Sequence, residues 1–75
     1  MASDTGTEIV AEMVANVLTV VAQSGQRLEP GDTIVILESM KMEIPVLTES
    51  GGMVREVRVD EGDVVQEGDV LAVIG

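Results

Sequence analysis

The stretch "SGQRLEPGDTIVILE", residues 24–38, returns in altered form as "EGDVVQEGDVLAVIG", residues 61–75, at a constant offset of 37 residues. Apolar positions of the first copy stay apolar in the second. Along the longer overlap six pairs are identical: Gly25/Gly62, Gly31/Gly68, Asp32/Asp69, Glu12/Glu49, Val17/Val54 and Val20/Val57. Such self-similarity indicates an internal duplication of one structural unit.

Each copy has the composition of short β-strands separated by glycine turns. The segments 17–21 and 54–59 are rich in β-branched residues, and the second alternates apolar with charged residues. The runs 33–38 and 70–74 follow Gly-Asp turns, where glycine supplies positive φ. We therefore predict an all-β fold, a flattened barrel or sandwich (a barrel-sandwich hybrid) of two four-stranded halves related by a pseudo-twofold axis.

This domain is predicted to span residues 7–75, and the small polar residues 1–6 are expected to form a disordered tail. The chain has no aromatic residue, so its core has to be built from Val, Ile, Leu, Ala and some Met. The constant offset predicts which counterparts are buried together: Val17, Ile34 and Ile36 with Val54, Leu71 and Val73.

Composition excludes several classes of function. A net charge of −10 opposes binding to nucleic acid or to an anionic membrane. The chain lacks Cys and His, which rules out disulfides, thiolate chemistry and the common zinc sites. We identify no catalytic pairing among the acids, and without aromatic anchors a deep ligand pocket is not expected. No signal peptide or membrane span is recognised, so we expect a cytoplasmic protein.

The single lysine lies in "ESMKMEIP", residues 38–45, at the joint between the two copies. Strands that end near Glu38 and restart near Met42 leave only Met40 and Lys41 for the turn. Two-residue hairpin turns favour Asn-Gly or Gly-X, because their central residues take positive φ. Positions that break a local rule tend to be functional or strained. The sequence thus predicts one exposed, unpaired amine on a projecting hairpin tip.

Plainer interpretations exist for the same residues. A solitary surface lysine usually serves solubility or protects a sheet edge, and Met40 and Met42 could be ordinary gap-fillers. The chain, however, already solubilises itself with acids, and exposed methionines on both sides of a turn favour a partner that covers them. For Glu38 and Glu43 two interpretations stay open: recognition by a modifying enzyme, or solvated strand ends.

The segment Glu38-Ser39-Met40-Lys41-Met42-Glu43 resembles the Glu-Ala-Met-Lys-Met attachment motif of biotinyl carrier domains, within the biotinyl/lipoyl family. The resemblance covers roughly residues 7–75 and is greatest to the small stand-alone attachment proteins of bacteria. Two departures stand out: Ser39 replaces the usual Ala, and residues 11–16, "AEMVAN", replace an Ala-Pro-Met-Pro-Gly stretch.

The resemblance implies that Lys41 receives biotin as an amide from a biotin protein ligase, with Met40, Met42, Glu38, Ser39 and Glu43 forming the surroundings of the cofactor. It further implies a non-catalytic carrier that shuttles carboxybiotin between the biotin carboxylase and carboxyltransferase sites of a carboxylase of acetyl- or acyl-CoA type. Such a carrier is expected to be a monomer when isolated.

Two alternatives remain. The first is a lipoyl carrier domain for a 2-oxo acid dehydrogenase, and the second is an acidic β-module that binds a partner with Lys41 incidental. Lipoyl domains typically carry Asp-Lys-Ala at the turn, so Met40 and Met42 favour biotin.

Overall fold

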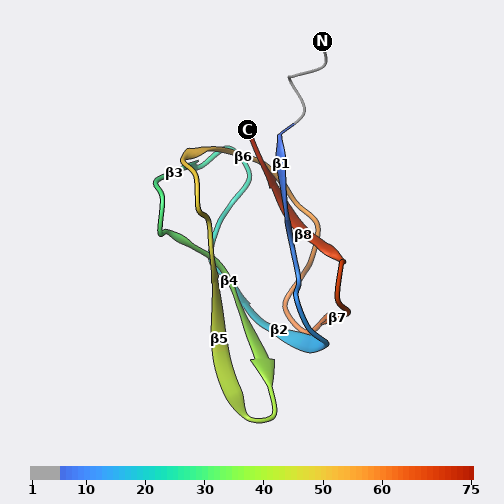
Figure 1. The fold of residues 1–75 in the computed structure, drawn as a ribbon. Helices are drawn as coiled ribbons and strands as arrows, with labels where there is room; N and C mark the ends of the chain where they lie inside the picture. The colour runs from blue at the N-terminus through green and yellow to red at the C-terminus, as the bar shows by residue number, and fades with distance from the viewer. Residues whose placement is uncertain (1–5) are drawn as a thin grey trace.

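The computed structural model describes residues 6–75, which form two four-stranded antiparallel sheets packed face to face (Figure 1). The strands are β1 (Thr7–Val10), β2 (Ala15–Val20), β3 (Arg27–Leu28), β4 (Thr33–Ser39), β5 (Met42–Leu47), β6 (Gly52–Val57), β7 (Val64–Val65) and β8 (Val70–Ile74). The predicted all-β class is confirmed, and the form is a sandwich rather than a closed barrel.

The two sequence halves interleave instead of forming one sheet each. One sheet has the order β1-β8-β6-β3 and the other β5-β4-β2-β7, so each takes two strands from each half. The offset of 37 residues superimposes β2 on β6 and β3 on β7 residue for residue. When each strand is replaced by its counterpart in the other half, the order β1-β8-β6-β3 becomes β5-β4-β2-β7. The duplication in the sequence is therefore a pseudo-twofold in the fold.

Hydrogen bonds at the glycine turns repeat in the same way. The Gly25 amide donates to the Val54 carbonyl at 2.8 Å, and the Gly62 amide donates to the Val17 carbonyl at 2.8 Å. Gly25 and Gly62 have φ values of 89° and 95°, a region where a residue with a Cβ is strained. Each half thus uses a glycine turn to bind the strand of the other half.

The identity of Asp32 and Asp69 in the two copies also has a structural reason. An Asp32 carboxylate oxygen accepts a bond from the Glu29 amide at 2.9 Å, and Asp69 does the same for the Gln66 amide at 2.9 Å. A short acidic side chain that bonds to a backbone amide nearby closes such turns. These aspartates therefore have a structural role.

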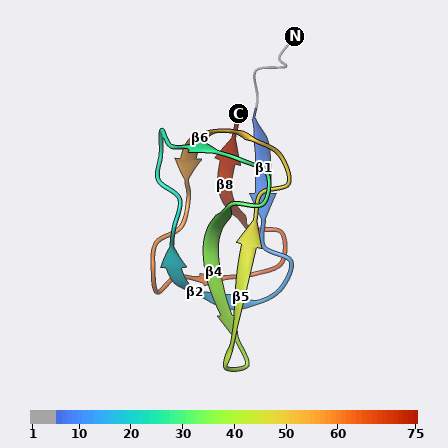
Figure 2. The ribbon, with the colours of Figure 1, turned by 90° about the vertical axis from the view of Figure 1, so that its left-hand side faces the viewer.

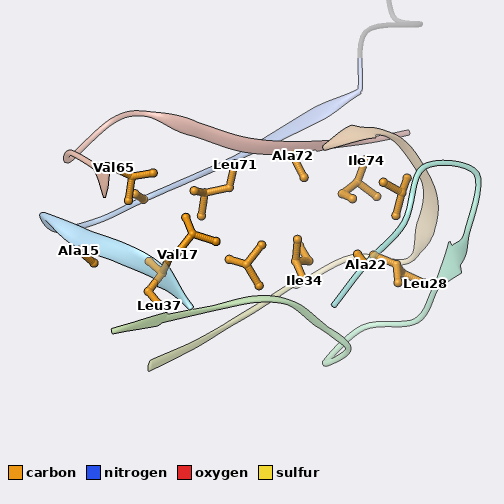
Figure 3. Packing of buried hydrophobic residues seen from close by; sticks show 13 residues of the cluster. Ala15, Val17, Ala22, Leu28, Ile34, Leu37, Val65, Leu71, Ala72 and Ile74 are labelled. Carbon is orange, nitrogen blue, oxygen red and sulfur yellow. The ribbon is translucent and has the colours of Figure 1, made fainter. Parts of the chain in front are cut away.

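The core lies between the sheets and consists of small aliphatic side chains (Figure 3). Three pairs of its fully buried members are counterparts at the offset of 37 residues, which are Val17 and Val54, Ile34 and Leu71, Leu37 and Ile74. No aromatic residue contributes, as the composition requires.

The predicted burial of Ile36 and Val73 is wrong: both are only partly buried, whereas Val35 and Ala72 are fully buried. The reason is a shift of register in each sheet. The β4–β5 pairing slips between Thr33 and Val35, which makes Ile34 an extra residue on β4. The β1–β8 pairing slips at the equivalent place, between Val70 and Ala72, which makes Leu71 an extra residue on β8. An irregularity of this kind breaks the period of two on which the prediction depended.

Residues 11–16, where the sequence departs from the family pattern, form the link from β1 into β2. Ala11 and Ala15 are both buried, and the Ala11 amide donates to the Asp69 carbonyl at 2.9 Å. Asn16 pairs with Glu38 near the neck of the β4–β5 hairpin. The departing residues are thus compatible with an ordered entry into the first half.

Two further observations concern the extent of the fold. Across residues 6–75, there is no helix long and apolar enough to span a membrane. The predicted tail, residues 1–6, lies outside the described residues apart from Gly6.

Candidate functional site

The β4–β5 hairpin projects beyond the body of the sandwich (Figures 1 and 2). The two residues of its turn, Met40 and Lys41, form the tip. Along the hairpin Leu37 pairs with Ile44, Glu38 with Glu43, and Ser39 with Met42. Leu37 is the last fully buried residue of β4. Since a strand rises about 3.3 Å per residue, the tip at Met40 stands roughly 10 Å past the end of the core.

The turn itself consists of Met40 and Lys41, as the sequence predicts. Their φ values are 54° and 66°, so both residues are in the left-handed region. Two such residues define a type I′ turn, whose twist matches that of the two flanking strands. The left-handed conformation costs about 1–2 kcal/mol for each residue with a Cβ. The β4–β5 pairing extends up to this turn, with Ser39 opposite Met42.

Lys41 is exposed, and large apolar side chains frame it. Met40 is 91% exposed and Met42 63% exposed, which makes Met40 the more exposed of the two. Within residues 6–75 the only ion pair joins Arg58 to Glu56, with 2.7 Å between Nε and Oε2. The prediction of an exposed lysine without an ion-pair partner is therefore confirmed for this part of the chain.

The strand register brings the remaining predicted residues to the neck of the hairpin. Glu38 and Glu43 face each other as a cross-strand pair, and neither has an ion-pair partner among the residues placed by the structure. Like charges opposite each other destabilise a sheet. Ser39 is partly buried beside Met42. All six predicted site residues thus lie in the last two positions of β4, the two-residue turn and the first two positions of β5.

The site is a projection and not a pocket. A hollow of about 990 Å³ lies between β1 and β5, lined by residues such as Ile9 and Val46, and neither Met40 nor Lys41 contributes to it. Over residues 6–75 no cluster of three or more His, Cys, Asp or Glu side chains could hold a metal ion. What the tip offers chemically is therefore a primary amine, accessible from solvent, at the end of a projecting hairpin.

Comparison with known proteins places this geometry in a family. The sequence pattern of the family described as biotin-requiring enzyme, the biotin/lipoyl family, matches residues 2–74. The chain belongs to the biotin/lipoyl family. Domains of this family are carriers, and the cofactor that the family description names is biotin. The earlier resemblance, which relied on the tip motif and the duplicated turns, is confirmed.

Individual relatives agree with this assignment. The chain is 54% identical over 67 residues to a biotinylated protein TB7.3 homolog of Mycobacterium leprae, covering 89% of this chain and 94% of that protein. It is 48% identical over 60 residues to the biotin/lipoyl attachment protein of Bacillus subtilis, covering 80% and 82% of the two chains. The Kluyveromyces lactis urea carboxylase contains a similar fold, with a TM-score of 0.88 and 33% identity over 93% of this chain and 6% of that one.

The tip of this biotin/lipoyl domain fits the group that the family description implies. Biotin has a carboxyl group that can form an amide, and Lys41 is the only lysine of the chain. The amine stands outside the sandwich with no pocket wall around it, so a ligating enzyme can approach it from several sides. Sequence reasoning named every residue of the tip, but it did not mark Thr7–Val10 as the strand β1.

Proposed function

We propose that this biotin/lipoyl domain is a biotin carboxyl carrier whose Lys41 is the attachment residue. The observation that carries the proposal is the lone lysine at the second position of a left-handed two-residue turn, exposed and framed by two exposed methionines. A strained turn of this kind is retained where its position matters more than its stability.

Attachment requires an activated carboxyl group and an unprotonated amine. In the proposed step the Lys41 Nζ attacks the acyl carbon of biotinyl-adenylate, the new C–N amide bond forms, and the bond from that carbon to the phosphate oxygen breaks. AMP leaves with the electron pair, and the amine loses a proton. The chain has no histidine to act as a base. The biotin protein ligase has to accept that proton.

Once attached, biotin supplies the carboxyl-accepting and carboxyl-donating chemistry. The chain contributes a long lysine stem on a projecting hairpin, and the tip lies at the opposite end of the domain from the C-terminus (Figure 1). Such a support keeps the body of the domain away from an active site that receives the arm. We propose that the arm serves a biotin carboxylase site and a carboxyltransferase site of acyl-CoA carboxylase type, in the cytoplasm, on a monomeric carrier.

A docked carrier would raise the local concentration of the arm to the mM range without new contacts at the reacting group. The proposed function of the chain is therefore to position the biotin arm, and its own side chains perform no bond-making step after attachment.

The deciding experiment compares the unaltered chain with Lys41→Arg. Each is incubated with purified biotin protein ligase, ATP and biotin, and the product is read by intact mass. We expect one biotin on the unaltered chain and none on the variant, with the circular dichroism spectra of the two chains superimposable. Labelling of the variant, or an unlabelled wild-type chain beside a labelled control carrier, would remove Lys41 from the proposed role.

A lipoyl carrier is the second candidate, because the Bacillus subtilis relative is named a biotin/lipoyl attachment protein. The same reaction with lipoate and a lipoate ligase distinguishes the two. A chain that takes only lipoyl would retain the carrier fold and refute the choice of biotin. A chain that takes neither would favour the acidic interaction module.

A further inference from the structure

The methionines of the described chain differ widely in exposure. Met40 is 91% exposed and Met42 63%, whereas Met53 on β6 is 46% exposed and Met13, between β1 and β2, is 38% exposed. Within residues 6–75, the two most exposed methionines are thus the two that flank Lys41. A methionine sulfur is oxidised more readily when it is accessible, and the product can be reduced again by dedicated enzymes.

We propose that Met40 and Met42 form an oxidative modification site, and that their sulfoxides slow the biotinylation of Lys41. The inference rests on the proposed function, since it concerns the loading of the same lysine. The oxidant is a peroxide, and the first target is the methionine at the turn itself. Met13 and Met53 serve as internal references for a less exposed sulfur.

The oxidation step is balanced by the peroxide alone. A lone pair of the methionine sulfur attacks one oxygen of hydrogen peroxide, an S–O bond forms and the O–O bond breaks. The leaving hydroxide takes the proton of the transferred oxygen and departs as water. The sulfur is oxidised by two electrons to the sulfoxide, and the peroxide is reduced. No group of the chain has to act as acid, base or metal ligand.

The consequence follows from what the tip presents to a ligating enzyme. To deliver an activated acyl group to Lys41, that enzyme has to cover the turn, where unmodified methionines offer apolar surface. A sulfoxide converts this surface into a polar one, and a polar group covered without a hydrogen-bond partner opposes binding. Because the tip projects beyond the core, the modification changes the contact surface without opening the sandwich.

The first measurement tests the selectivity. The intact, unbiotinylated chain is treated with a graded series of hydrogen peroxide, and each methionine is followed by peptide mass spectrometry. We expect Met40 and Met42 to gain 16 Da several-fold faster than Met13 and Met53, in line with their exposure. Equal rates at all four positions, or faster oxidation of Met13 and Met53, would overturn the proposal.

The second measurement tests the consequence for loading. Oxidised and untreated chains are compared in kcat/KM for biotin ligation, and a third sample is restored with methionine sulfoxide reductases and a thiol. We expect a loss of roughly fivefold or more on oxidation and recovery after reduction. An untreated chain that takes no biotin would refute the proposed function, whereas equal rates before and after oxidation would refute only this inference.

Matched variants separate the tip from the rest of the chain. Met13→Leu with Met53→Leu should keep the full effect of peroxide. In the double variant Met40→Leu with Met42→Leu, peroxide should no longer lower the rate of biotin ligation. The treated variant is compared with the untreated variant, so a changed starting rate does not matter. Circular dichroism of every oxidised sample excludes unfolding as the cause. An effect that persists in the second double variant would contradict the assignment to Met40 and Met42.

Discussion

Lys41 combines three properties that separately carry little information. It is the only lysine of a chain with 14 acidic residues, it lies at a turn position that disfavours side chains, and its neighbours are exposed methionines. A solvated surface lysine explains the exposure but not the turn. The attachment hypothesis explains all three, since a modifying enzyme needs an accessible amine, a fixed direction of approach and surface to contact.

The apolar neighbours lead to a prediction about the choice of cofactor. Met40→Asp together with Met42→Ala replaces the apolar surface by a charge that the biotin ligase must desolvate without a partner. Each methionine contributes about 1–3 kcal/mol when fully buried. We expect biotin loading to fall and lipoyl loading to rise relative to it, measured by intact mass in competition between both purified ligases.

The matched control is Met53→Ala, which removes a methionine that is 46% exposed on β6, away from the tip. It should leave the ratio of the two products unchanged. If the double variant keeps the same preference for biotin as the unaltered chain, the methionines do not select the cofactor.

At the scale of the element, the hairpin shows how much of the site follows from the sequence. The break between two β-rich segments, the duplication around it and the residues Met40 and Lys41 together fixed the place of the turn. The opposition of Glu38 and Glu43 follows from any two-residue turn at that position. Whether an enzyme recognises those two acids stays a prediction, because it depends on a surface that this chain does not contain.

The burial pattern could be predicted only in part, and the reason is local. Alternation from Ile34 predicts that Ile36 is buried, but Ile34 and Val35 are both buried because the β4–β5 pairing slips at Ile34. From Val35 onward the alternation buries Leu37 and leaves Ile36 only partly buried. The strand β1 was missed because four residues give too short a pattern, although its counterpart β5 lies 37 positions on. Irregular pairing leaves no signature in a single sequence as clear as that of a glycine turn.

Turn strain gives a prediction at this scale. Met40→Gly removes the Cβ from a residue at φ 54° whose side chain contacts mainly solvent, so it should raise the free energy of unfolding by about 0.5–1 kcal/mol. The same change at Met42, in the strand β5, should lower it by about 1 kcal/mol, because glycine weakens a strand. Urea unfolding followed by circular dichroism measures both, since the chain has no tryptophan.

A loss of stability in Met40→Gly as large as that in Met42→Gly would show that the turn is not strained. The hairpin orientation would then have to be attributed to the strand pairing alone.

At the scale of the whole molecule, two copies of one unit build a single core. The sheets exchange strands between the halves, and glycine turns from each half hydrogen-bond to the other. Neither half can therefore bury its apolar face alone. Lys41 lies in the connection between the halves, so its hairpin is formed by β4 and β5, one strand from each copy.

This interdependence predicts equal costs for equivalent truncations. Val17 and Val54 are counterparts, 2% and 1% exposed, and both become smaller by the same two methyl groups on substitution by Ala. We expect each change to lower the free energy of unfolding by about 2 kcal/mol, from lost burial and the cavity left behind. The control is Val64→Ala, at a residue 65% exposed, which should cost less than about 0.5 kcal/mol. Urea midpoints that differ strongly between the Val17 and Val54 variants would mean that one half folds around its own core and the other merely docks on it.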